Sequence, residues 1–376
     1  MSLLSDDQKM LQETAASFLG EEGSIGKQLR HWRDIECKDG FGHGLWKQFA
    51  ELGFTGVCIP ESHGGLGLGA TEAALMLEEI GRNLTPSPFL TTAVAGARAI
   101  TGTSHADRWF PAILSGEAVL ALAVDEGPRH RPEATALEAK RQGNGFVLNG
   151  AKQFVVHGAS ADMIVTTART AGSAGEREGI TLFAVPKDAA GLTTENLTLV
   201  DSSKAARLTF ENVALDADAV IGEVDAGWQT LSRALAAGNA GAAAELVGVA
   251  SGASAITLDY LKQRKQFGRL IGEFQALQHR AAHLYAEIEI ARAAAFKAAL
   301  LLDSGDERAD LHVSVAKAKA ADVANLAVRE GVQMHGGIGM TDEHDIGLFM
   351  KREAVLGELF GGIYFHREQV ARLSGY

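Results

Sequence analysis

Three zones of different hydrophobic patterning follow one another along the chain. In the first, which ends near Gly116, apolar residues recur at intervals of three and four, as in Leu45, Phe49 and Leu52. This is the spacing of the buried face of an amphipathic helix. A glycine-rich loop over Pro60–Gly69 interrupts the pattern before it resumes. The first zone is therefore predicted to be helical.

The second zone, from about residue 117 to 222, is made of short apolar or alternating segments separated by turn residues. The dipeptide Asn149-Gly150 is a strong hairpin signal, and Gly143 and Asn144 mark another turn. Strands so closely spaced, with no helical pattern between them, favour an antiparallel β domain. The expected strands are 119–124, 135–140, 163–168, 180–185 and 208–213.

The third zone, from about Gly227 to the end, returns to helical spacing with longer helices. Phe274, Leu277 and Ala281 begin a run with intervals of three and four, which is typical of the inner face of a helix bundle. A further helix over 308–333 ends at two glycines. The order of the zones predicts an α+β fold of three packed domains. We place their boundaries at 1–117, 118–226 and 227–376.

Composition limits the classes of function open to the chain. Its 376 residues are 46% hydrophobic and 22% charged, an ordinary balance for a globular protein. The net charge is −12, so the chain offers no basic surface for a dedicated nucleic-acid binder. The two cysteines, Cys37 and Cys58, are too few for a disulfide framework. We expect two reduced thiols and a cytoplasmic protein.

Neither membrane insertion nor a metal site is expected. The segment that begins at Met1 has no basic and apolar leader pattern, so we predict no signal peptide. The apolar run Ala234–Ala255 comes nearest to a membrane span, but polar residues interrupt it. His335, His344 and His366 do not form a metal-ligand set with nearby carboxylates.

Two segments carry more specific information. One begins with Arg264-Lys265-Gln266-Phe267-Gly268, and the other runs from Gln333 to Thr341 with several glycines. The chain contains no P-loop, GxSxG or HExxH motif. In an α–β–α chain of this length, the two segments resemble the acyl-CoA dehydrogenase family. The Gly64-Gly65-Leu66-Gly67 loop and Glu79-Ile80-Gly81-Arg82 resemble the same family, so the likeness covers essentially the whole chain.

This resemblance implies FAD as cofactor and an acyl-CoA thioester as substrate. Such enzymes form a 2,3 double bond: a carboxylate removes the α-proton while hydride passes from Cβ to the flavin. The resemblance also implies a C-terminal four-helix bundle, a tetramer, and an electron-transfer flavoprotein as electron acceptor. Arg264 and Phe267 match residues that reach the FAD of a neighbouring subunit in relatives. The implied cofactor-binding residues are Arg264, Phe267, Gln275, Gln333, Gly336 and Gly337.

The flavin side departs from the family pattern. Asp125 stands where relatives carry a threonine, the Gly-Ser pair that follows is missing, and Val156 replaces a second threonine. A valine offers the flavin no side-chain hydrogen bond. The resemblance places Gly361 where many relatives have the glutamate base, and Gly361 cannot accept a proton.

No other carboxylate takes the place of that base convincingly. A second family position for it falls at Gly238-Asn239, again without a carboxylate. Glu245 is a weak candidate: it shares a helix face with Gly238 but lies about 10 Å further along the axis. Glu358 and Glu343 are flanking carboxylates of similar standing. The catalytic residue is therefore left open.

These departures lead to one hypothesis with two alternatives. The chain is predicted to be the non-catalytic subunit of a heterotetrameric α2β2 acyl-CoA dehydrogenase, in which it completes the FAD pocket of a homologous partner. The first alternative is an active homotetramer with a relocated base. The second is a redox-inactive acyl-CoA-binding or structural relative. The sequence does not distinguish among acyl chains.

Overall fold

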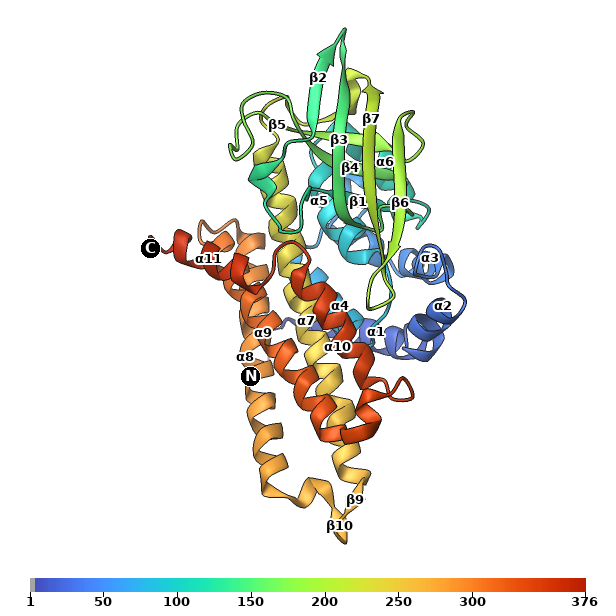
Figure 1. Ribbon diagram of the computed structural model, residues 1–376, viewed down its shortest axis with the longest axis vertical. Coiled ribbons are helices and arrows are strands. Elements are labelled where there is room, and N and C mark those ends of the chain that lie inside the picture. The colour runs from blue at the N-terminus through green and yellow to red at the C-terminus, as the bar shows by residue number, and fades with distance from the viewer. Residues whose placement is uncertain (1–3) are drawn as a thin grey trace. The chain divides into compact units, whose positions relative to one another are not determined.

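The protein is described by a computed structural model that covers residues 4–376, so the first residues of the segment examined for a signal peptide lie outside it (Figure 1). The chain divides into two compact units. Unit one comprises the segment up to His31, Ala70–Pro86 and Asn239–Tyr376. Unit two comprises Trp32–Gly69 and Ser87–Gly238.

Unit one is built almost entirely of helices. Because α8 and α9 carry buried alanines at intervals of three and four, such as Ala291, Ala295 and Ala298, the two helices pack side by side (Figure 1). Its elements are α1 (Asp6–Glu21), α4 (Ala70–Arg82), most of α7 (Trp228–Gln263), β9 (Lys265–Gln266), β10 (Arg269–Leu270), α8 (Gln275–Ser304), α9 (Ala309–His335), α10 (Ile346–Glu358) and α11 (Ile363–Leu373).

Two glycines allow α4 and α7 to cross at very short range. A Cβ added to Gly81 would lie 2.0 Å from the Glu245 carbonyl oxygen, and one added to Gly248 would lie 1.9 Å from that of Glu78. Any larger residue at either position would force the helices apart. The glycine of the Glu-Ile-Gly-Arg segment thus has a packing role at this crossing.

The N-terminus of α4 is capped by a side chain that is distant in sequence. The Asp303 carboxylate, on α8, accepts hydrogen bonds from the backbone N–H groups of Ala70 and Thr71 at 2.7 and 2.9 Å, and from the Thr71 hydroxyl at 2.6 Å. A negative charge at this end of a helix also interacts favourably with the helix dipole. Asp303 therefore both caps α4 and ties it to α8.

We expect Asp303→Ala to lower the free energy of unfolding by about 1–2 kcal/mol, because it leaves these donors without their cap. Urea denaturation followed by circular dichroism measures the change. Asp310→Ala, an exposed acid in the first turn of α9, is the matched control and should cost much less. Equal losses in the two variants would mean that the cap contributes nothing of its own.

Unit two is centred on an eight-stranded sheet with β1 paired outside the main strand order β6-β7-β3-β2-β4-β5-β8. Its strands are β1 (Leu120–Ala123), β2 (Glu138–Gln142), β3 (Gly145–Val156), β4 (Met163–Arg169), β5 (Ile180–Pro186), β6 (Leu192–Thr198), β7 (Lys204–Leu215) and β8 (Val220–Ile221). The longer helices and helical turns of this unit are α3 (His43–Glu51), a π-helical turn (Phe89–Gly96), α5 (Ala97–Ile100) and α6 (Ser104–Leu114). The short α2 (His31–Asp34) lies at the division between the units.

The predicted α+β fold class is confirmed, but two details of the sheet were wrong. Asn149-Gly150 does not form a hairpin: β3 continues through it, and the pairing with β7 shifts register there. Gly150 has φ 140° and packs against Leu137, so the glycine serves a bulge rather than a turn. The sheet is also not purely antiparallel, since β1 and β2 both pair with β4 in parallel. The turn at Gly143 and Asn144 does join β2 to β3 as predicted.

Helix α7 has the length and apolar composition of a membrane span. Its most apolar window has a mean hydropathy of 1.4, and 83% of that window is buried inside the protein. Burial of this extent is typical of the core helix of a bundle. The observation agrees with the sequence-based interpretation of the alanine-rich run.

Candidate functional site

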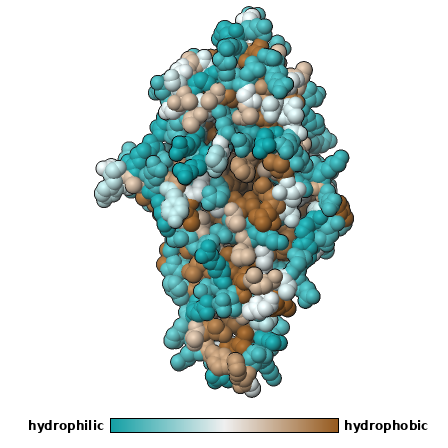
Figure 2. All heavy atoms as spheres, viewed as in Figure 1, coloured by the Kyte–Doolittle hydropathy of each residue, from teal (hydrophilic) through white to brown (hydrophobic). Residues whose placement is uncertain are grey.

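The first predicted cofactor segment forms a short hairpin at one end of unit one. Arg264 follows the last residue of α7, and β9 and β10 form the hairpin next to it (Figure 1). Phe267 lies at the hairpin tip with φ 54° and is 91% exposed. In Figure 2 apolar side chains gather at the end of the molecule where this hairpin lies. An aromatic side chain held this far from its own core is available to contact another molecule.

The second segment lies at the C-terminal end of α9. Gly336 caps the helix with φ 63° and ψ −139°, a conformation that only glycine adopts readily. No atom lies within 4 Å of the position that a Cβ would take on Gly336 or on Gly337. The backbone here therefore borders open space, in contrast to the glycines at the α4–α7 crossing.

Contacts between helices bring the two segments to the same end of the bundle. The Tyr260 ring, one turn before Arg264, lies 4.5 Å from the His335 ring, centroid to centroid. Arg280 on α8 forms an ion pair of 2.5 Å with Glu330 on α9. The six predicted cofactor residues are all solvent-exposed. We refer to them together as the bundle-end cluster: Arg264, Phe267, Gln275, Gln333, Gly336 and Gly337.

His335, the last residue of α9, is buried inside this end of the bundle. Its ring is 3% exposed, and its Nδ1 donates to the Gly331 carbonyl oxygen at 2.7 Å. Burial lowers the pKa of His335 below its ordinary value, although the hydrogen bond to Gly331 opposes the shift. A neutral ring packed against Tyr260 is the expected state at pH 7. Sequence analysis had excluded His335 from a metal-ligand set in favour of a solvent-facing or hydrogen-bonded ring, but it could not identify Gly331 and Tyr260 as its partners.

The expected position of the catalytic base carries neither a carboxylate nor room for one. Gly361 has φ 109°, and a Cβ added there would lie 2.5 Å from Cδ1 of Phe365. The Gly361 carbonyl oxygen accepts a hydrogen bond of 3.1 Å from the Lys317 ammonium. The ring of Phe365 thus occupies the space that a side chain at this position would need.

Glu245 is held in an ion pair. It is 2% exposed, and its Oε1 accepts hydrogen bonds from Nε and Nη2 of Arg352 at 3.0 and 2.5 Å. This buried ion pair joins Glu245 on α7 to Arg352 on α10 and so stabilises the packing of the two helices. The other two weak candidates, Glu343 and Glu358, lie at the surface. The geometry favours a structural role for Glu245.

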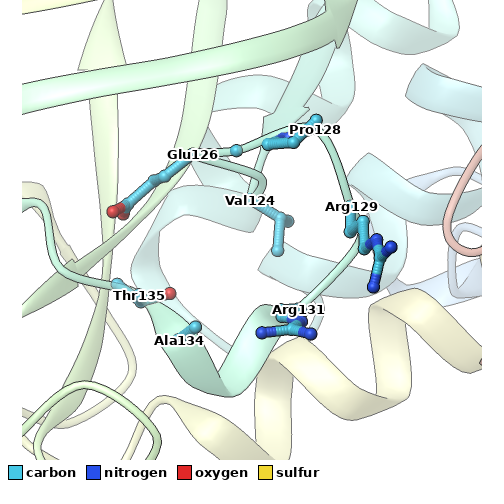
Figure 3. A pocket seen from close by; sticks show the side chains of 8 residues that line it. Val124, Glu126, Pro128, Arg129, Arg131, Ala134 and Thr135 are labelled. Carbon is cyan, nitrogen blue, oxygen red and sulfur yellow. The ribbon is translucent and has the colours of Figure 1, made fainter.

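The flavin-side segments lie in unit two. Both carboxylate oxygens of Asp125 lie 3.0 Å from His130 Nδ1, so the side chain that replaces the family threonine is engaged within its own loop. Val156 ends β3 without a polar side-chain atom. Close to Asp125, a pocket of about 470 Å³ opens along the loop between β1 and β2 (Figure 3).

A buried lysine fixes this loop. Lys152 on β3 is fully buried and donates to the Val124 carbonyl at 3.0 Å, to Thr167 Oγ1 at 2.7 Å and to Glu126 Oε1 at 2.6 Å. Burial lowers the pKa of Lys152, and the Glu126 carboxylate opposes the shift. Sequence analysis missed this pair, because 26 residues separate its members and no local pattern links them.

Over residues 4–376, no group of three or more His, Cys, Asp or Glu side chains is arranged to hold a metal ion. His335 and His344 do lie close together, with ring centroids 4.2 Å apart and ring planes tilted by 50° to each other.

Sequence models of the N-terminal, middle and C-terminal domains of acyl-CoA dehydrogenases match residues 5–117, 125–213 and 225–374. The chain belongs to the acyl-CoA dehydrogenase family. Members of this family are FAD-dependent flavoproteins. The resemblance drawn from the sequence motifs is therefore confirmed, as is FAD as the cofactor of the family. The three-domain boundaries stay a prediction, since contacts group the described residues into two units.

Among acyl-CoA dehydrogenases, one similar protein is the cyclohex-1-ene-1-carbonyl-CoA dehydrogenase of Geobacter metallireducens, 33% identical over 324 residues that cover 84% of each chain. A similar solved structure is a variant of the Tcur3481–Tcur3483 steroid ACAD, with 29% identity, a TM-score of 0.88 and 98% of each chain covered. Another is described as the electron transferring flavoprotein of Acidaminococcus fermentans, with 28% identity, a TM-score of 0.91 and full coverage of both chains.

Proposed function

We propose that this chain is the non-catalytic subunit of a heterotetrameric acyl-CoA dehydrogenase, in which it completes the FAD pocket of a homologous partner. The observation that carries the proposal is the position of Phe365. Its ring, on α11, fills the space beside Gly361. A side chain that could act as the base therefore has no room at this position. The second family position for the base, at Gly238-Asn239, carries no carboxylate either.

The bundle-end cluster supports a role at a cofactor held mainly by another chain. Arg264, Gln275 and Gln333 present exposed polar side chains, and the two glycines border open space. A guanidinium suits a pyrophosphate because it donates several charged hydrogen bonds in one plane. These residues fit the adenosine and pyrophosphate portion of FAD. When bound, FAD supplies the acceptor for the substrate hydride.

The flavin side of this chain supports the same proposal. The Val156 side chain has no hydrogen bond to offer a flavin ring, and the Asp125 carboxylate is already engaged by His130. The chain therefore keeps the residues that would serve a neighbour's FAD and lacks those that would hold a flavin of its own. An active homotetramer would need both sets.

The relatives suggest what the complete enzyme does. One relative is named cyclohex-1-ene-1-carbonyl-CoA dehydrogenase. Another is described as a steroid ACAD, and its name joins two proteins, Tcur3481 and Tcur3483. We extend to this chain an acyl-CoA substrate, a homologous partner subunit, and a cytoplasmic location. An electron-transfer flavoprotein is the proposed electron acceptor. The acyl chain itself stays open.

The test is a visible spectrum and an FAD-to-chain ratio of the protein purified alone, with its native mass. We expect a colourless or FAD-poor protein. Anaerobic addition of octanoyl-CoA or cyclohex-1-ene-1-carbonyl-CoA should then cause no flavin bleaching. About one FAD per chain in a homotetramer, bleached by either thioester, would overturn the proposal and establish an active homotetramer.

A second arm uses the chain together with a co-expressed partner that holds FAD. Phe267→Ala should lower the FAD content of that complex without unfolding this chain, because the ring is 91% exposed. Tyr364→Ala, on a residue that is 83% exposed on α11, is the matched control and should leave the FAD content unchanged. Equal FAD content in the wild type and in both variants would contradict the proposed role of the hairpin.

A further inference from the structure

Two histidines of α8 lie about one helical turn apart on its exposed side. His279 and His283 belong to the first turns of the helix, which follow the hairpin of unit one (Figure 1). Side chains four residues apart on a helix are neighbours, with about 5–6 Å between their Cβ atoms. Two imidazoles at this interval can bind one metal ion from the same helix face.

The ring nitrogens of both histidines are available to a ligand. Within residues 4–376, no hydrogen bond or ion pair joins the side chain of His279 or His283 to another group, and both residues are exposed. Ala282 and Ala286, each three residues further along the helix, are exposed as well. The positions beside the imidazoles therefore carry only methyl groups, and a hydrated ion can approach from solvent.

The charged side chains around the pair are themselves paired. The Glu287 carboxylate, one turn after His283, is engaged by the Lys319 ammonium of α9. Lys319 holds the pKa of the Glu287 carboxyl below its ordinary value, and His283 contributes to the same shift, so this ring lies near the carboxylate. Arg280 is likewise paired with Glu330 at 2.5 Å. Both cations are thus offset by a carboxylate, which weakens the repulsion that a metal ion would meet.

We propose that His279 and His283 form a two-ligand site for a late first-row divalent metal ion, and that the bound ion stabilises the first turns of α8. Imidazole nitrogen suits Zn²⁺, Ni²⁺ and Cu²⁺, whereas Mg²⁺ prefers oxygen ligands. Water completes the coordination of the ion. The proposal departs from the expectation, drawn from three other histidines, that the chain holds no metal site. It does not depend on the accessory-subunit proposal.

The site lies close to the bundle-end cluster. Gln275, the first residue of α8, precedes His279 by about 6 Å along the helix axis. Gln278 Nε2 donates to the Gly272 carbonyl oxygen at 2.9 Å, which ties the same turn to the segment after the hairpin. Helix ends fray unless they are held. An ion bound across this turn therefore limits fraying of the helix end that carries Gln275.

Calorimetric titration of the purified chain with Ni²⁺, together with thermal unfolding followed by circular dichroism, tests the site. We expect one saturable binding event that is tighter for Ni²⁺ than for Mn²⁺. The melting temperature should rise with the Ni²⁺ concentration, because the two ligands are held together only in the folded helix, and EDTA should reverse the rise. His279→Ala and His283→Ala should each raise the dissociation constant at least about tenfold, since loss of an outer-shell partner alone usually costs that much.

Two further variants separate the spacing of the pair from the number of histidines. His312→Ala removes a histidine of α9 that has no second histidine within one turn, and it should leave Ni²⁺ binding unchanged. His283→Ala/Tyr285→His keeps the number of histidines but moves one imidazole to another side of α8. Tyr285 is 63% exposed, so the helix should accept this change. The variant should bind Ni²⁺ as weakly as His283→Ala does.

Three outcomes would overturn the proposal. Ni²⁺ binding that persists in the His279→Ala/His283→Ala double variant would place the ion elsewhere. An equal rise in melting temperature with Mg²⁺ would indicate carboxylate ligands. Full binding by His283→Ala/Tyr285→His would show that the spacing is irrelevant. The double variant replaces two exposed side chains, so its melting temperature without metal should match that of the wild type, and loss of binding then reports on the site. The FAD-to-chain ratio, measured separately, decides the accessory-subunit proposal without affecting this one.

Discussion

A glutamate placed at position 361 is expected to destabilise the protein rather than to create a working base. A Cβ at this position would lie 2.5 Å from the Phe365 ring, and the backbone has φ 109°. Overpacking and backbone strain each cost of order 1–3 kcal/mol. We therefore expect Gly361→Glu to lower the free energy of unfolding by about 2–4 kcal/mol in urea denaturation, with no gain of dehydrogenase activity when FAD and an acyl-CoA are supplied.

Two further variants separate the steric effect from the charge. Gly361→Ala adds the same Cβ without a carboxylate and should cost nearly as much as Gly361→Glu. Gly337→Ala places a Cβ where no atom lies within 4 Å and should change stability by less than about 0.5 kcal/mol. A Gly361→Ala protein as stable as the wild type would show that Phe365 yields freely. Packing of Phe365 would then not exclude a side chain at position 361.

The second large effect concerns Lys317, which holds the same turn from inside the bundle. Its side chain is buried, and its ammonium donates to the carbonyl oxygens of Gly357 and Gly361 at 2.8 and 3.1 Å. Burial lowers the pKa of Lys317 to about 7 from its ordinary 10.5, while the carboxylates of Glu358 and Glu353 oppose the shift. The folded chain therefore releases this proton at a lower pH than the unfolded chain does.

The sign of the pH dependence follows from this difference. Between about pH 7 and 10.5 the unfolded chain binds a proton that the folded chain has released, so Lys317 makes stability rise with pH. The slope is at most about 1.4 kcal/mol per pH unit. We expect the stability of the wild type relative to Lys317→Met to increase by several kcal/mol across this window, and to be constant below it.

Denaturation curves of both proteins at a series of pH values measure that difference, and other titrating groups cancel in the comparison. Lys319→Met is the control, because Lys319 lies two residues away on α9 and pairs with Glu287 at the surface. Its stability difference from the wild type should show no comparable slope. A flat difference for Lys317→Met would mean that the ammonium stays protonated in the fold.

The sequence predicted the helical elements better than the strand connections. The apolar periodicity over Phe274–Ile288 and the glycines after Gln333 are local signals, and α8 and α9 follow them closely. Asn149-Gly150 is also a local signal, but pairing of β3 with β7 on both sides of it determines the structure there. The strand β6 (Leu192–Thr198) was not predicted, since it is mostly exposed and polar and shows little alternation.

The candidate site shows the same division between local and distant information. Arg264, Phe267 and Gly336 could be selected from short motifs, and the structure places them at one end of the bundle. The partners that define Glu245 and Lys152 could not be selected. Arg352 lies 107 residues from Glu245, and Glu126 lies 26 residues from Lys152. Only the packing of separate elements brings such charges together.

The tip of the β2–β3 hairpin offers a practical route to the assembled enzyme. Gly143 and Asn144 are exposed, and a Cβ on Gly143 would meet no atom within 4 Å. Exposed tips of small residues accept inserted sequence with little effect on the fold. An affinity tag or fluorophore placed between these two residues would label the chain within unit two. It would leave the bundle-end cluster of unit one unaltered for assembly.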